Sequence, residues 1–78
     1  MKILLLEDDL ILNEIIQEHL IEKEHSVLSV FTGDDAQDAI YSKTFDILLL
    51  YVNVPNINGF ELLNQLRKNG IKTPAIFI

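Results

Sequence analysis

The sequence predicts an α/β protein in which helices cover both faces of a parallel sheet. Four short segments rich in apolar residues (2–6, 25–31, 46–52 and 75–78) alternate with three segments that carry helical periodicity or helix-capping residues. Short apolar runs bounded by turn residues are typical of strands buried on both faces. Strands that alternate with helices form parallel sheets through right-handed crossovers. We therefore expect the order β-α-β-α-β-α-β in a single three-layer domain, residues 1–78.

Composition and charge exclude several other classes of protein. Of the 78 residues, 49% are hydrophobic, which suits a folded core and excludes a disordered chain. The net charge of −6 argues against a nucleic-acid surface, because phosphate binding needs clustered Lys and Arg. The absence of cysteine excludes a disulfide scaffold and a Cys-based zinc site. Because no apolar run is long enough for a membrane span, we expect a cytoplasmic protein with no membrane partner.

The first strand and helix are joined by three acids. The run 2–6 is continuously apolar after its lysine, and Glu7, Asp8 and Asp9 follow it. Asp9 or Asp8 is expected to cap a helix over 10–23, where acids suit the positive helix end. This helix is expected to be amphipathic, with an apolar stripe made of Leu12, Ile16 and Leu20 and flanked by Ile11 and Ile15.

The second strand and helix follow the same plan. The segment 25–31 alternates loosely between apolar and polar residues, and 32–34 (Thr-Gly-Asp) has turn and capping chemistry. We expect a helix over 35–42. Its inward-facing residues are expected to be Ala36, Ala39 and Ile40.

The third strand, 46–52, ends in a loop rich in turn residues. Asn58 is expected to cap a third helix, 59–68, which the pair Asn69-Gly70 ends. The expected core residues of this helix are Phe60, Leu62, Leu63 and Leu66. The loop lies at the carboxyl end of its strand, where open α/β sheets bind their ligands.

Four segments together resemble the receiver domain of response regulators in two-component signalling. They are ILLLEDD (3–9), TGDDAQDAI (32–40), DILLLYVNVPNINGFELL (46–63) and TPAIFI (73–78), in the order and at the spacing of that family. The resemblance covers the whole chain and implies a flavodoxin-like fold with strand order 2-1-3-4-5. The first and third strands are then neighbours, so that Glu7, Asp8 and Tyr51 converge at one edge of the sheet.

The resemblance also implies a magnesium site. In the family, two acids after the first strand, an acceptor aspartate after the third strand and a backbone carbonyl two residues later hold Mg²⁺. The matching residues here are Glu7, Asp8, Tyr51 and Asn53, the last through its carbonyl. Mg²⁺ prefers oxygen ligands. Because Tyr51 stands where the family has aspartate, we expect only weak Mg²⁺ binding and no other cofactor. An acid pair taken alone is more often a solvated helix cap.

Tyr51 also decides the expected chemistry. A phenol keeps its proton at neutral pH, which makes it a weak nucleophile and a poor ligand for a hard cation. We therefore expect no catalytic residue and no enzyme. The hydroxyl is expected to donate a hydrogen bond to Glu7 or Asp8. Alternatively, Tyr51 turns into the loop and only covers apolar surface.

Compared with a complete receiver, the sequence stops after the fourth strand. The Ser or Thr and the Lys that read the phosphoryl group in the family, and the last helix, have no counterpart in residues 1–78. We therefore expect a partial receiver domain whose apolar surface and strand edge favour a homo-oligomer.

The function that we expect is a receiver-type module of a two-component phosphorelay that does not accept a phosphoryl group. Its expected partners are a sensor histidine kinase or other receiver domains. The alternatives are a phosphoaccepting domain that uses a neighbouring acid such as Asp8, and a non-phosphorylated module for protein interaction or oligomerisation. A weaker third class is a flavodoxin-like cofactor binder.

Overall fold

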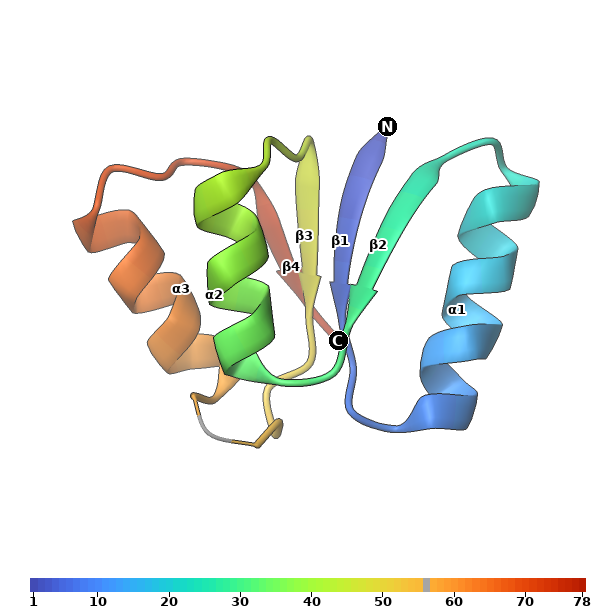
Figure 1. Cartoon of the computed structure of the whole chain (residues 1–78), viewed down its shortest axis with the longest axis horizontal. Coiled ribbons are helices and arrows are strands. Elements are labelled where there is room, and N and C mark those ends of the chain that lie inside the picture. The colour runs from blue at the N-terminus through green and yellow to red at the C-terminus, as the bar shows by residue number, and fades with distance from the viewer. Residues whose placement is uncertain (56) are drawn as a thin grey trace.

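The computed structural model describes residues 1–55 and 57–78, and it has the predicted alternation of strands and helices (Figure 1). In chain order the elements are β1 (Lys2–Leu6), α1 (Leu10–Glu22), β2 (Ser26–Val30), α2 (Gly33–Ser42), β3 (Ile47–Leu50), α3 (Gly59–Lys68) and β4 (Ala75–Phe77). The predicted α/β class and element order are therefore confirmed.

The four strands form one parallel sheet in the order β2-β1-β3-β4. This order confirms that the first and third strands are neighbours. Leu6, the last residue of β1, pairs with Leu50 of β3 on one side and with Val30 of β2 on the other. The carboxyl ends of these three strands therefore lie together, as the resemblance implies.

The main hydrophobic core lies between the sheet and the layer formed by α2 and α3. Alternate residues of the strands supply its sheet side, as expected for strands whose side chains alternate between faces. Its buried members are Leu4, Leu6, Val30, Ala36, Ile40, Phe45, Leu48, Leu50, Val54, Leu62 and Leu66. The inward orientation predicted for Ala36 and Ile40 of α2 is confirmed, and Ala39 packs against the same cluster.

The helix α1 lies on the opposite face of the sheet from α2 and α3 (Figure 1). It packs on β1 and β2. The predicted apolar stripe is correct only in part, because Ile16 and Leu20 are half-buried whereas Leu12 and Ile15 are exposed. The buried residue of this helix is instead Asn13. The apolar stripe of α1 is thus wider than the part of the helix that contacts β1 and β2.

The helix caps agree with the prediction, but one core residue does not. Asp9, Thr32 and Asn58 each accept a hydrogen bond from the backbone N–H three residues later. Phe60, which we expected in the core, is 59% exposed. It follows the first residue of α3 and packs edge-to-face on Phe77, with ring centroids 4.7 Å apart.

Several element boundaries differ from the predicted ones. α1 ends at Glu22 rather than at residue 23, and β2 (Ser26–Val30) is one residue shorter at each end than predicted. β3 (Ile47–Leu50) is shorter than the predicted 46–52 because the chain enters its loop at Tyr51. α2 starts at Gly33 rather than at Asp35 because Thr32 already caps it. β4 ends at Phe77, one residue before the predicted end. Within the described residues, no helix has both the length and the apolar character needed to cross a membrane.

Candidate functional site at the carboxyl edge of the sheet

The candidate site is built on the backbone pairing of β1, β2 and β3. The N–H of Tyr51 donates to the carbonyl of Leu6 at 2.9 Å, and the N–H of Glu7 donates to the carbonyl of Val30 at 3.2 Å. Each of these bonds continues the sheet one residue past the strand ends. Glu7 and Tyr51 therefore leave neighbouring strands at the same level, which confirms that the fold brings these two positions together.

Glu7 is the buried acid of the site. Its side chain is 1% exposed, and its Oε2 atom has no hydrogen-bond partner among the described residues. Burial raises the pKa of Glu7 above its ordinary value, and the neighbouring Asp8 raises it further through a side-chain hydrogen bond and charge repulsion. Hydrogen bonds from the backbone N–H groups of Asp9 and Asp8 act in the opposite direction. A buried carboxylate with a free oxygen suits a cation or a proton donor.

The other two acids of the triplet have different environments. Asp8 is exposed. Asp9 is exposed as well, and its Oδ1 accepts the N–H of Leu12 at 3.0 Å as the N-cap of α1. Of the two residues that we considered as the cap, it is therefore Asp9.

Tyr51 does not make the hydrogen bond that we expected. No such bond joins its hydroxyl to Glu7 or Asp8 in the described part of the chain, and Glu7 Oε2 stays unpaired. The half-buried Tyr51 packs against the main hydrophobic core. The ring contacts this apolar cluster. Its position therefore agrees with the alternative expectation, that Tyr51 covers apolar surface.

The loop after β3 is held against two helix starts. The N–H of Gly59 donates to the carbonyl of Val52 at 2.9 Å, and the N–H of Gly33 donates to the carbonyl of Pro55 at 3.4 Å. A Cβ atom at Gly59 would lie 2.9 Å from the carbonyl oxygen of Tyr51, and a Cβ at Gly33 would collide with the backbone of Ile57. Both glycines therefore allow close backbone contact around the site.

Asn13 is a residue of the site's framework that sequence reasoning missed. Its side-chain amide, 1% exposed, donates to the carbonyl of Glu7 at 3.0 Å and to that of Val30 at 3.5 Å. It thus ties α1 to the ends of β1 and β2. The signal was present in the sequence, because a polar residue next to the apolar stripe of a helix is expected to be bonded when it is buried.

The residues present fit Mg²⁺ only in part. No group of three or more His, Cys, Asp or Glu side chains that could hold a metal occurs within residues 1–55 and 57–78. The available oxygen donors are the carboxylates of Glu7 and Asp8 and the carbonyl of Asn53, which lies in the loop two residues after Tyr51 with an exposed side chain. The unpaired Oε2 of Glu7 is the observation that favours a cation here.

Comparisons with known proteins agree with this fold. A family profile described as "Response regulator receiver domain" matches residues 3–78. The transcriptional regulatory protein CrdR of Helicobacter pylori is 40% identical over 78 residues, which are 99% of this chain and 37% of CrdR. The chain thus spans about a third of the length of the curated relatives that it matches.

Solved structures show the same similarity. The receiver domain of the Francisella response regulator 1452 superposes with a TM-score of 0.96 at 29% identity, covering 97% of this chain and 63% of that one. The response regulator TrrA of Thermotoga maritima, solved with Mg²⁺ and BeF, has a TM-score of 0.85 at 26% identity, covering 97% of this chain and 64% of that one.

The fold, the acid pair at the end of β1 and these matches together define a class of protein. The chain belongs to the response regulator receiver domain family of two-component signalling.

Proposed function

We propose that this chain is a receiver module of a two-component phosphorelay in which Tyr51 takes the place of the phosphoryl-accepting aspartate. The observation that carries the proposal is the backbone bond from Tyr51 to Leu6, which sets residue 51 beside Glu7 at the end of the sheet. A side chain that starts at this position is the one best placed to meet the acid pair. Here that side chain ends in a phenol.

The chemistry of the two side chains explains why phosphoryl transfer is lost. A carboxylate beside a metal ion is ionised at neutral pH and attacks a phosphoryl group directly. A phenol with an ordinary pKa near 10 keeps its proton and needs a base to become a nucleophile. Tyr51 packs on the core, and no acid accepts its proton in the described structure.

Mg²⁺ binding follows the same reasoning. When bound, the ion would offset the negative charge of a phosphoryl group, and its holders in this chain are Glu7, Asp8 and the carbonyl of Asn53. Two carboxylates with water ligands make a weak site, because the third carboxylate is missing. Weak binding is thus part of the proposal.

The experiment is incubation of the protein with acetyl phosphate and MgCl₂, followed by intact-mass measurement. We expect no gain of phosphoryl mass. The alternative function, phosphorylation of a neighbouring acid, is favoured by the exposure of Asp8, which does not cap α1. A gain that persists in Tyr51→Phe and disappears in Asp8→Asn would establish this alternative. A gain that disappears in Tyr51→Phe would show that the tyrosine itself accepts the group.

The partners that we propose are those of a signalling module. Family membership supports a sensor histidine kinase or another receiver domain. The net charge of −6 supports the absence of a nucleic-acid contact through this chain. Self-association is supported by exposed apolar side chains on α1 and around β4, which are Leu10, Ile11, Leu12, Ile15, Ile21, Ile76, Phe77 and Ile78.

A further inference from the structure

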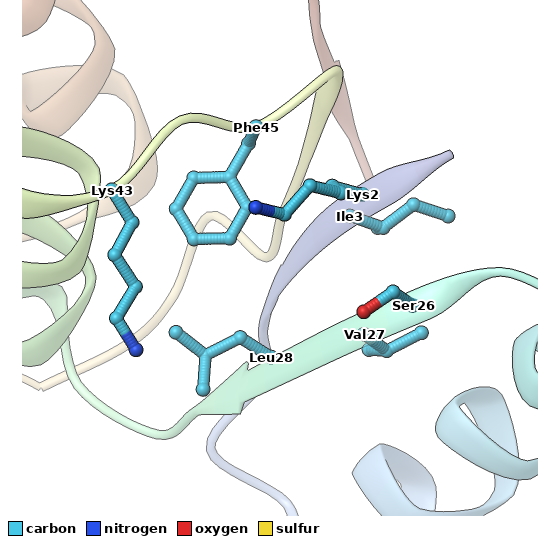
Figure 2. A pocket seen from close by; sticks show the side chains of 7 residues that line it. All are labelled: Lys2, Ile3, Ser26, Val27, Leu28, Lys43 and Phe45. Atoms are coloured by element: carbon cyan, nitrogen blue, oxygen red, sulfur yellow. The ribbon is translucent and has the colours of Figure 1, made fainter.

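A cavity of about 260 Å³ lies at the opposite end of the sheet from the acid pair. Figure 2 shows the side chains that line it. It opens where β1 and β2 begin and where α2 connects to β3. Its lining residues are Lys2, Ile3, Ser26, Val27, Leu28, Lys43 and Phe45. Neither the acid pair nor Tyr51 contributes to it, so it is separate from the candidate phosphorelay site.

The register of the strands gives this cavity a polar rim and an apolar floor. Lys2 pairs with Ser26 across β1 and β2, so both side chains leave the sheet on the same face. Leu28, two residues beyond Ser26, packs against the main core on that face, and Phe45 is part of this core. The cavity is thus the open amino end of the main core, with polar groups at its mouth.

Positive charge gathers at this mouth although the chain is acidic. Two of the six Lys and Arg residues of the chain line the cavity, and no salt bridge to either is found in the described part of the chain. Figure 2 shows the Lys43 side chain extending along the cavity toward Leu28. Both ammonium groups are therefore available to an anion.

Nearby negative charge limits the strength of this site. Asp46 accepts the backbone N–H of Lys2 through Oδ2 at 2.6 Å, and its own N–H donates to the carbonyl of Lys2 at 2.7 Å. Its carboxylate is thus held by the backbone rather than by an ammonium group. The carboxyl end of α2, just before Lys43, adds a partial negative charge.

We propose that this cavity binds a small organic carboxylate with one apolar group. The carboxylate would lie between the ammonium groups of Lys2 and Lys43, with the Ser26 hydroxyl as a further donor. The apolar group would contact Leu28 and Phe45. The volume is below the roughly 300–1,000 Å³ of sites for larger ligands, which limits the apolar group to about one ring. Because both lysines are exposed, the expected dissociation constant is on the order of millimolar.

The test is a titration with phenylacetate, followed through the backbone amide resonances of the ¹⁵N-labelled protein. We expect saturable shifts at 26–28 and 43–45, and none at Glu7 or Tyr51. Phenylacetamide has the same ring without the charge, and acetate has the charge without the ring. Each is expected to bind at least about threefold more weakly, because each lacks one of the two interactions.

Three variants separate a specific site from general attraction. Lys43→Gln is expected to weaken phenylacetate binding by about three- to tenfold, the range for one exposed charge pair. Lys72→Gln, an equal change of charge at an exposed residue outside the cavity, is expected to have no effect. Ser26→Leu fills the cavity mouth without a change of charge and is expected to abolish saturable binding.

Two results would overturn the proposal. One is equal affinity for phenylacetate and phenylacetamide, which would show that the lysines do not recognise the carboxylate. The other is binding that survives Ser26→Leu or that Lys72→Gln weakens as much as Lys43→Gln does. Since Lys43 and Ser26 are exposed, these variants are expected to keep the fold, which the amide spectrum itself reports.

Discussion

Glu7 has the most unusual environment of the acids in this chain, and that environment links folding to pH. Its carboxylate is buried beside Asp8, and burial raises its pKa above the ordinary 4.5. The folded state therefore holds the Glu7 proton more tightly than the unfolded state does. Stability from this group is greatest below pH 4.5 and falls as the pH rises from there through the pKa of the folded protein.

We expect Glu7→Gln to remove this loss of stability, because glutamine has the shape of the protonated acid and carries no charge. The variant should be more stable than the parent at pH 7, and its urea midpoint should change less between pH 4.5 and pH 7. Urea titrations followed by circular dichroism, with a chelator present, measure both quantities. The matched control is Glu14→Gln, an exposed acid of α1. The account would be contradicted if the urea midpoints of the parent and of Glu7→Gln changed by the same amount between pH 4.5 and pH 7.

Single contacts between elements hold the site together. Asn13 joins α1 to the carbonyls of Glu7 and Val30. Its loss removes the side-chain donor to the Glu7 carbonyl, whereas the Val30 carbonyl still accepts the N–H of Glu7. We expect Asn13→Ala to destabilise the protein by about 1–3 kcal/mol. Asn64→Ala, an exposed residue of α3, is expected to change stability by less than about 0.5 kcal/mol. Equal urea midpoints for the two variants would show that the Asn13 bonds are dispensable.

The start of α3 is fitted to the loop that carries Tyr51. A methyl group at Gly59 would lie 2.9 Å from the carbonyl oxygen of Tyr51. The crowded atoms are backbone atoms, which cannot move aside as the end of a flexible side chain can. We expect Gly59→Ala to cost about 1–3 kcal/mol of stability, the usual cost of overpacking. Gly70→Ala is a useful comparison, because its strain comes from a positive φ of 80° and not from crowding. The amide resonances of 51–53 should shift in Gly59→Ala and stay in place in Gly70→Ala.

These contacts also explain how much could be predicted from the sequence. Strands, helices and caps follow from local patterns in the sequence. The prediction that Asp9, Thr32 and Asn58 cap helices is therefore correct. The exposure of Phe60 and the position of the Tyr51 ring depend on what packs beside them, which no periodicity encodes.

The same limit applies to the candidate site. Its backbone placement follows from strand order, and the sequence predicted Glu7 beside Tyr51 correctly. The role of Asn13 comes from a bond to β2, and that of Gly59 comes from its close approach to the backbone of Tyr51, and helical or strand periodicity predicts neither contact.

In the described part of residues 1–78, both α1 and β4 expose apolar side chains. Ile11 is 73% exposed and Ile76 is 51% exposed, and β4 is a terminal strand of the sheet. We expect the average mass measured by light scattering to rise with protein concentration, because such surfaces and strand edges associate. Ile11→Glu should reduce the association, whereas Glu14→Gln on the same helix should not. A constant monomer mass over the concentration range would contradict self-association.

The central claim is that a receiver scaffold carries a site from which Tyr51 has removed the third carboxylate. The most direct measurement is Mg²⁺ titration of the parent, Tyr51→Asp and Tyr51→Phe, followed through the amide resonances of 7–9 and 51–53. We expect Tyr51→Asp to bind Mg²⁺ at least about tenfold more tightly than the parent, since it adds a carboxylate to two others. Tyr51→Phe should bind as weakly as the parent does. Equal affinity in the parent and Tyr51→Asp, or loss of binding in Tyr51→Phe, would contradict the claim.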